Sequence, residues 1–356
     1  MTRHSPHTPS PSTGSTDATD ATGSTGPTGS TGEGPARRTV LRGAAAATAG
    51  SAAVLWSAAP QADAAAPQAV ATPSAPDPEA PTGRILRRRT GPFEVLALLD
   101  AHGPFPGKQT DHFAGATPEA WARAKRIDPR AFGPADTWVL DFRCYAIRRP
   151  GGRVTLVDTG VGPADSPAAP WAPVPGHLPQ VLADAGIRRR DVDTVVLTHL
   201  HEDHYGWAVS PAGVPMLPEA RYVVQRAETA ALTEKDTAYR YVVAPLRRTG
   251  QLHEVDGRTR LLGAGKRRSG AVVLLPTPGH TAGHQSVLVD GGGRRIMVTG
   301  DALVHAVQLA DPAVPYRYER DPATARRSRE QLLREARAGR ALLATAHLNT
   351  TFLPVR

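Results

Sequence analysis

Short apolar runs recur along the chain beyond residue 84, and several of them end directly in residues that can do chemistry. Runs of this length, bounded by glycine, proline and small polar residues, predict buried β-strands. Two of the runs flank the glycines 291–293 and predict a hairpin. The expected strands cover residues 154–157, 195–197, 222–224, 272–275, 286–289 and 295–298.

Two stretches show the spacing of an amphipathic helix instead. Apolar residues at Leu178, Val181, Leu182 and Ala185 share one helical face, and Gly186 supplies a stop signal. A second helix is expected over residues 323–338. Strands mixed with scattered helices predict an α/β fold, with functional residues in the loops at strand ends.

The chain before residue 84 has a different composition. Residues 5–36 are Ser, Thr, Gly, Pro and Ala with almost nothing apolar, and such a segment cannot bury enough surface to offset its ordering entropy. We therefore divide the chain into a disordered tail (1–36), a signal segment (37–64), a Pro/Ala-rich linker (65–83) and one folded domain (84–356).

The signal segment resembles a twin-arginine export signal. Arg37 and Arg38 precede an apolar stretch over residues 43–59, and Ala62-Asp63-Ala64 offers a small-x-small cleavage pattern. The stretch is shorter and less apolar than a spanning helix of roughly 20 residues, so we expect removal near Ala64 rather than a stable membrane anchor. The expected partner is the twin-arginine translocation machinery, and the expected destination is the cell envelope or the exterior.

Charge and cysteine content add little to this picture. The formal net charge is +9, carried almost entirely by Arg, and no pattern of Arg with aromatic residues indicates a nucleic-acid module. We expect no nucleic-acid partner. Cys144 is the single cysteine, so an intrachain disulfide and a CxxC metal site are both excluded.

The densest chemistry follows the strand expected at 195–197. His199 and His201 are two apart, and on an extended segment such residues project to the same side. Asp203 and His204 follow as the chain turns, where they can reach a second cation. Imidazole and carboxylate suit Zn²⁺ and also Mn²⁺, Fe²⁺ or Co²⁺, so this pattern alone leaves the metal open.

Thr198-His199-Leu200-His201-Glu202-Asp203-His204 resembles the signature of the metallo-β-lactamase superfamily. The family's other elements occur in order, and the resemblance covers residues 84–356. They are Asp158-Thr159-Gly160, Pro278-Gly279-His280, Gly300-Asp301-Ala302 and Ala346-His347-Leu348.

This resemblance implies an αββα sandwich, with two sheets face to face and helices outside. It implies two divalent metal ions, with zinc as the expected metal, and a bridging water or hydroxide as the nucleophile. Asp203 or Asp301 would accept the proton. The implied ligands are His199, His201 and His280 for one metal, Asp203, His204 and His347 for the other, and Asp301 for both.

Residue differences within the superfamily narrow the expected branch. Asp301 argues against true β-lactamases, which generally lack the bridging Asp, and the nine residues after His347 leave no room for the helical domain of glyoxalase II. Lactonases and methyl-parathion-hydrolase-like enzymes remain. Val304 stands where lactonases often place a Tyr, which weakens the lactone assignment.

The expected activity is hydrolysis of a small-molecule lactone or carboxylic ester, with phosphotriester hydrolysis as the alternative. A non-catalytic metal-binding protein and a mononuclear-iron dioxygenase are alternatives of other classes. The roles of several further polar residues stay open: Asp158, His284 and His305 as supports or structural residues, His102 as a weaker candidate, and Tyr316 and Tyr318 as pocket residues.

Overall fold

The computed structural model describes residues 84–263 and 270–355. The expected tail, signal segment and linker (1–36, 37–64 and 65–83) lie outside the described residues. Within the described ranges, no helix has the length and apolar character needed to cross a membrane.

The first sheet has seven strands in the order of the chain. Its first four strands pair antiparallel, whereas β4, β5, β6 and β7 run parallel to one another. The strands are β1 (Ile85–Thr90), β2 (Phe93–Lys108), β3 (Thr137–Arg148), β4 (Val154–Val157), β5 (Val192–Val196), β6 (Arg221–Gln225) and β7 (Leu252–Val255).

The second sheet has six strands, also in chain order. All neighbours pair antiparallel except β11 and β12, which are parallel. The strands are β8 (Thr259–Leu262), β9 (Ala271–Pro276), β10 (Gln285–Asp290), β11 (Arg295–Val298), β12 (Ala341–Ala344) and β13 (Leu353–Pro354).

Helices cover the outer faces of both sheets. The α-helices are α1 (Gln109–His112), α2 (Pro118–Ile127), α3 (Leu178–Asp184), α4 (Glu202–Tyr205), α5 (Arg226–Ala230), α6 (Ala244–Arg248), α7 (Val307–Ala310) and α8 (Pro322–Ala338). Short 3-10 turns span Pro129–Ala131, Pro134–Asp136, Arg189–Asp191 and Gly300–Ala302, and a π-helical turn spans Tyr239–Val243.

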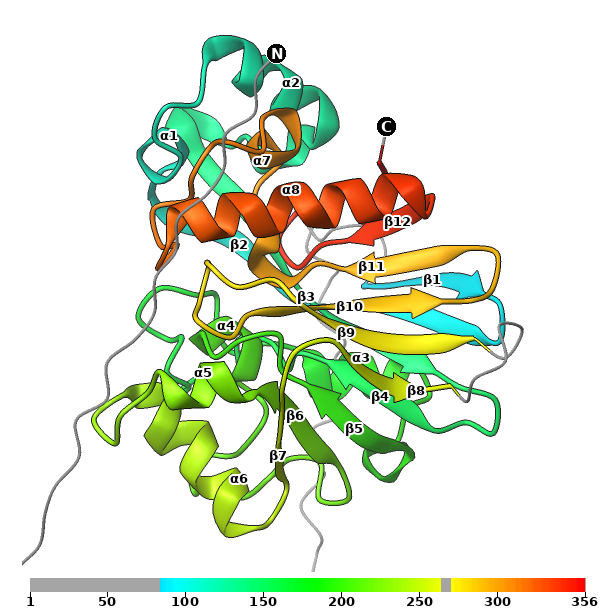
Figure 1. Ribbon diagram of the computed structural model, residues 1–356. Helices are drawn as coiled ribbons and strands as arrows, with labels where there is room; N and C mark the ends of the chain where they lie inside the picture. The colour runs from blue at the N-terminus through cyan, green and yellow to red at the C-terminus, as the bar shows by residue number, and fades with distance from the viewer. Residues whose placement is uncertain (1–83, 264–269, 356) are drawn as a thin grey trace, which may run out of the picture. The chain divides into compact units, whose positions relative to one another are not determined.

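Three apolar layers hold these elements together. Side chains such as Val157 and Val196 of the first sheet meet Val287 and Val298 of the second in the central core. Helix α3 packs on the outer face of the first sheet, and α8 packs on the outer face of the second. Figure 1 shows α8 running along the sheet that contains β11 and β12, with α5 and α6 beside β6 and β7. The expected αββα sandwich is therefore confirmed.

Two pairs of parallel strands determine where the polar loops meet. In the first sheet, Asp158 follows β4 and His199 lies in the loop after the neighbouring strand β5. In the second sheet, Asp301 follows β11 and His347 follows the neighbouring strand β12. The carboxyl ends of parallel neighbours lie at one edge of a sheet, so each sheet brings two of these loops together.

Candidate metal centre

The loop that carries the histidine cluster is fastened to the strand beside it by Asp158. This residue adopts a left-handed backbone conformation (φ 61°) directly after β4. Its carboxylate accepts hydrogen bonds from the Thr198 backbone N–H at 2.7 Å and the Thr198 hydroxyl at 2.9 Å. These hydrogen bonds fix the position of Thr198, the first residue of the His loop, without any contribution from the metal ligands.

A glycine is required where the second sheet approaches this loop. Gly300 has φ +50°, and a Cβ there would lie 2.7 Å from His284 Nε2 and 3.0 Å from the Thr198 Cβ. The absence of a side chain lets the Asp301 loop lie against the His loop.

The first ligand group consists of His199, His201, His280 and one oxygen of Asp301. His201 Nδ1 lies 3.0 Å from His199 Nε2 and 2.9 Å from His280 Nε2. Asp301 Oδ2 lies 3.3 Å from His280 Nε2 and 3.8 Å from His199 Nε2. Their donor atoms all converge on one point, as a bound cation requires.

The second ligand group consists of Asp203, His204 and His347. His204 Nε2 lies 3.3 Å from Asp203 Oδ2 and 3.3 Å from His347 Nε2. The second carboxylate oxygen of Asp301, Oδ1, lies 3.3 Å from His204 Nε2 and 3.1 Å from His347 Nε2. Asp301 therefore faces both groups, one oxygen to each.

The electrostatics of the first group fit a metal. Burial lowers the pKa of His199 and of His280 well below the usual value, so both imidazoles are neutral and carry lone pairs. Burial alone would raise the pKa of Asp301, but His347, His204 and His280 hold it well below the usual range. The neutral imidazoles of His199 and His280, each within about 3 Å of His201 Nδ1 and beside an ionised carboxylate, form a donor set suited to a divalent cation.

The ligands of the second group are oriented from behind by hydrogen bonds. His204 Nδ1 donates to Asp158 Oδ2 at 2.9 Å, and His347 Nδ1 donates to the Asp141 carbonyl at 3.0 Å. Each bond fixes the ring and turns Nε2 toward the other donor atoms of the group, as binding of a shared cation requires. His284 acts differently, because its Nε2 accepts the Asp301 backbone N–H at 2.9 Å. Both Asp158 and His284 thus support ligands.

His102 and His305 lie outside both ligand groups. His305 is buried among Phe113, Trp121, Phe132 and Trp138, with ring centroids 4.9–5.6 Å away, and its Nδ1 accepts the Val307 N–H. Burial lowers its pKa to about 3, so it is neutral. His102 bonds to Asp141 at 2.7 Å.

A pocket of about 300 Å³ opens onto both ligand groups. Beyond the ligands, its walls are mainly aromatic and aliphatic, and they include Tyr316 and Tyr318 as well as Val304. The lining residues other than the ligands are Phe105, Pro106, Trp138, Leu140, Trp171, Glu202, Val304, Tyr316 and Tyr318.

Tyr316 lines the pocket and has a hydroxyl that can donate a hydrogen bond to a substrate. Its ring lies parallel to that of His280, at 6.0 Å and 10°. The side chain is 6% exposed, and among the described residues nothing is hydrogen-bonded to its hydroxyl. Burial, and then the charges of Asp301 and Asp203, raise the pKa of this hydroxyl well above its usual value, so it stays protonated.

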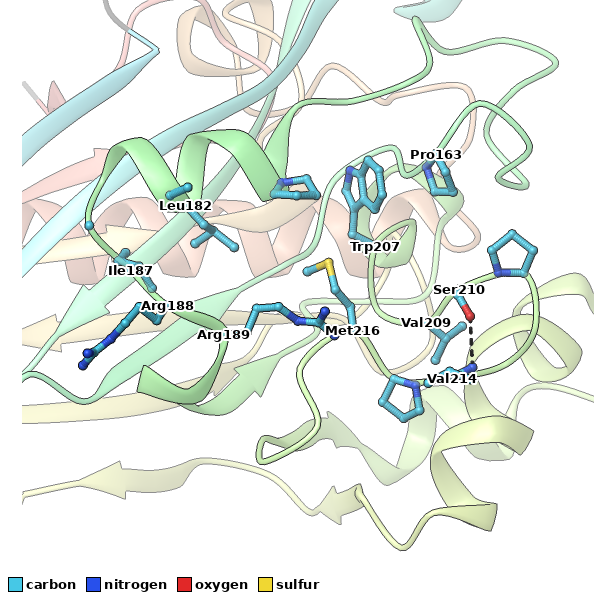
Figure 2. A pocket seen from close by; sticks show the side chains of 15 residues that line it. Pro163, Leu182, Ile187, Arg188, Arg189, Trp207, Val209, Ser210, Val214 and Met216 are labelled. Atoms are coloured by element: carbon cyan, nitrogen blue, oxygen red, sulfur yellow. Dashed lines mark hydrogen bonds between the residues drawn. The ribbon is translucent and has the colours of Figure 1, made fainter. Parts of the chain in front are cut away.

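A larger hollow, of about 1040 Å³, lies elsewhere and has no such chemistry. Figure 2 shows Trp207 and Met216 within it and Arg188 and Arg189 to one side. No His, Cys, Asp or Glu is among the residues that line it. We therefore assign the chemistry to the smaller pocket, because only that pocket contains converging ligands.

The structure brings all seven expected ligands together, and it adds residues that the sequence did not single out. Glu228 and Asp141 are buried beside the ligand loops, and Trp138 is part of the pocket wall. Glu228 follows the buried strand β6, as Asp158 follows β4 and Asp301 follows β11, and this position is the one signal that could have identified it.

Comparisons with known proteins agree with this geometry. The family model described as metallo-beta-lactamase superfamily matches residues 143–347. A probable metallo-hydrolase of Mycobacterium bovis is 28% identical over 220 residues, which cover 56% of this chain and 69% of that protein.

Two solved structures share the fold at low sequence identity. The hydrolase AbOPH of the beta-lactamase superfamily has a TM-score of 0.58 at 20% identity, over 76% of this chain and 97% of its own. AidC, described as a dizinc quorum-quenching lactonase, also has a TM-score of 0.58 at 20% identity, over 74% and 90%.

Proposed function

The chain belongs to the metallo-beta-lactamase superfamily and is a metal-dependent hydrolase, and from this premise we propose a more specific function. It is an exported enzyme that holds two divalent metal ions, with zinc expected, and cleaves a small-molecule lactone or related carboxylic ester.

One observation carries the proposal of two metals. Asp301 presents Oδ2 to the first ligand group and Oδ1 to the second, and each group has three further candidate ligands. A carboxylate shared in this way compensates the charge of two neighbouring cations. The description of AidC as a dizinc enzyme supports the same stoichiometry.

The reaction divides between the metals and the side chains. When bound, the divalent ions would lower the pKa of water to about 7 and supply a hydroxide nucleophile at neutral pH. Asp203 and Asp301 face the same space and can accept the proton of the attacking water. Tyr316, with an unbonded hydroxyl in the same pocket, can donate to the carbonyl oxygen as negative charge develops there.

Replacing Tyr316 with Phe should lower kcat/KM about ten- to hundredfold and leave zinc content unchanged. The hydroxyl would donate to a developing oxyanion, and a hydrogen bond to a charged group is worth about 1.5–3 kcal/mol. Steady-state kinetics on the best ester substrate measure the effect.

Tyr318→Phe is the matched control, because Tyr318 lines the same pocket but is 49% exposed. It should change kcat/KM less than about threefold, well below the effect of a charged hydrogen bond. Equal effects of the two substitutions would remove Tyr316 from the mechanism.

Hydrolysis of phosphotriesters is the second candidate, and Val304 favours it. Val304 lines the pocket beside the ligands. It stands at the position where lactonases often have a tyrosine that binds the lactone carbonyl. The aromatic walls suit an apolar leaving group of either substrate class.

A substrate panel on zinc-loaded protein distinguishes these candidates. Lactones, aryl esters, phosphotriesters and a β-lactam are compared by kcat/KM, and metal content is measured separately on the protein as purified, before zinc is added. A preference for lactones or esters supports the proposal, and a preference for phosphotriesters supports the second candidate. Rapid turnover of the β-lactam alone, or one equivalent of iron in place of two of zinc, would contradict both.

We also propose export through the twin-arginine route, on the basis of Arg37-Arg38 and the pattern that ends at Ala64. The test replaces both arginines with Lys and follows the protein by fractionation and intact mass. Wild-type protein should be found outside the cytoplasm with its N-terminus near residue 65, and the double variant should stay inside at full length. Equal distribution of the two proteins would argue against this route.

A further inference from the structure

Glu228 connects two loops that are far apart in sequence and both carry metal ligands. Its side chain is buried, on the short helix α5 that follows β6. Oε1 accepts the Leu200 backbone N–H at 2.9 Å, and Oε2 accepts the Gly283 backbone N–H at 2.7 Å. Leu200 lies between His199 and His201, and Gly283 lies three residues after His280.

The contact between α5 and the second loop is too close for any side chain at position 283. A Cβ on Gly283 would lie 2.2 Å from the Glu228 backbone nitrogen and 2.7 Å from its Cα. The backbone of the His280 loop is therefore in van der Waals contact with Glu228, and the Glu228 carboxylate also accepts a hydrogen bond from this loop. Both carboxylate oxygens are engaged, one by each loop, so the side chain ties both loops to α5.

The second ligand group has separate supports. Asp158 orients His204, and the Asp141 carbonyl orients His347. The two side-chain hydrogen bonds of Glu228 go to Leu200 and Gly283, and neither reaches Asp203, His204 or His347.

We propose that Glu228 is a positioning residue for the first ligand group alone, so that the two metal sites can be weakened separately. The inference rests on the proposed two-metal function. Glu228 belongs to neither ligand group and does not line the pocket. It sets the distance between the loop of His199 and His201 and the loop of His280, and hence the convergence of their three nitrogens.

Zinc titration of the full chain against a chelator tests the proposal without using activity. His280→Ala and His347→Ala first identify which binding step belongs to which ligand group. Glu228→Gln should then weaken the step that His280→Ala removes by about 10- to 100-fold, as expected when the support of a ligand is lost. The Gln amide would present a donor to a backbone N–H, so one of the two hydrogen bonds is lost.

Glu254→Gln is the matched control. Glu254 is also a carboxylate beside α5, but its partners are Thr229, Arg226 and Arg247 rather than the ligand loops. It should leave both zinc-binding steps unchanged. Glu228→Asp keeps both carboxylate oxygens with a shorter reach and should weaken the same step as Glu228→Gln by a smaller factor.

The possible outcomes separate the two proposals. Wild-type protein that binds fewer than two zinc ions would overturn the two-metal function itself. If wild-type binds two, the positioning role is overturned when Glu228→Gln weakens the His347 step, both steps equally, or neither. Circular dichroism of the metal-free variants checks folding, and if Glu228→Gln does not fold, the same criteria apply to Glu228→Asp.

Discussion

Replacing Asp301 with Ala should lower hydrolysis at least about a thousandfold and reduce the bound metal below two equivalents. Asp301 faces both ligand groups, one carboxylate oxygen to each, and its loss removes negative charge from the point where two cations would meet. Charge stabilisation by a metal is worth several kcal/mol in a transition state, and each 1.36 kcal/mol corresponds to a factor of ten.

Kinetics and elemental analysis on the same preparations measure both effects. Asp301→Asn keeps the size of the side chain but not its charge, and it should fall between wild type and Asp301→Ala in metal content. Asp256→Ala serves as control, because Asp256 is an exposed partner of Arg226. Full activity and full metal content in either Asp301→Ala or His199→Ala would refute the scheme.

Replacing Arg329 with Met should lower the free energy of unfolding by about 3–5 kcal/mol, the cost of breaking one partner of a buried ion pair. Arg329 lies on α8 and is fully buried, and its guanidinium donates to Glu319 at 2.7 Å. It also donates to the backbone carbonyls of Ala302, Pro312 and Val314. The substitution would remove the guanidinium donor from Glu319 and from all three carbonyls, and it would leave the neutral Gln308 amide as a donor to Glu319 and Val314.

Urea unfolding of the metal-free proteins measures the change without interference from metal loading. Arg326→Met on the same helix is the control, since Arg326 pairs with Glu330 at the surface, where ion pairs contribute about 0–1 kcal/mol. The double variant Arg329→Met with Glu319→Gln should recover part of the loss. A change below about 1 kcal/mol in Arg329→Met would show that α8 does not depend on this pair.

The strands that were predictable from sequence are those whose apolar runs are uninterrupted. β4, β6, β9, β10 and β11 lie where the runs indicate, and so do helices α3 and α8. β2 and β3 were missed for physical reasons. β2 continues through Gly103, Pro104 and Pro106, which normally end a strand, and β3 buries Asp141 and Arg143 at positions where a strand normally buries apolar residues.

The candidate ligands could be predicted from the sequence because they lie within a few residues of one another or in short recognisable motifs. The supports could not, because they depend on contacts between distant segments. Glu228 meets Gly283 across 55 residues, and Arg329 meets Ala302 across 27. A carboxylate that accepts backbone N–H groups leaves no pattern in the residues it holds, since every residue except proline offers the same group.

Because the ligands of the second group come from both sheets, the second metal site can form only late in folding. His204 and His347 are 143 residues apart, and they meet only after the parallel pair β4–β5 and the parallel pair β11–β12 have docked. A nascent chain therefore has no complete second site until its synthesis has passed His347 and both sheets have folded. Metal capture is then a late event, and its rate in a refolding experiment should follow the docking of the two sheets rather than the formation of either one.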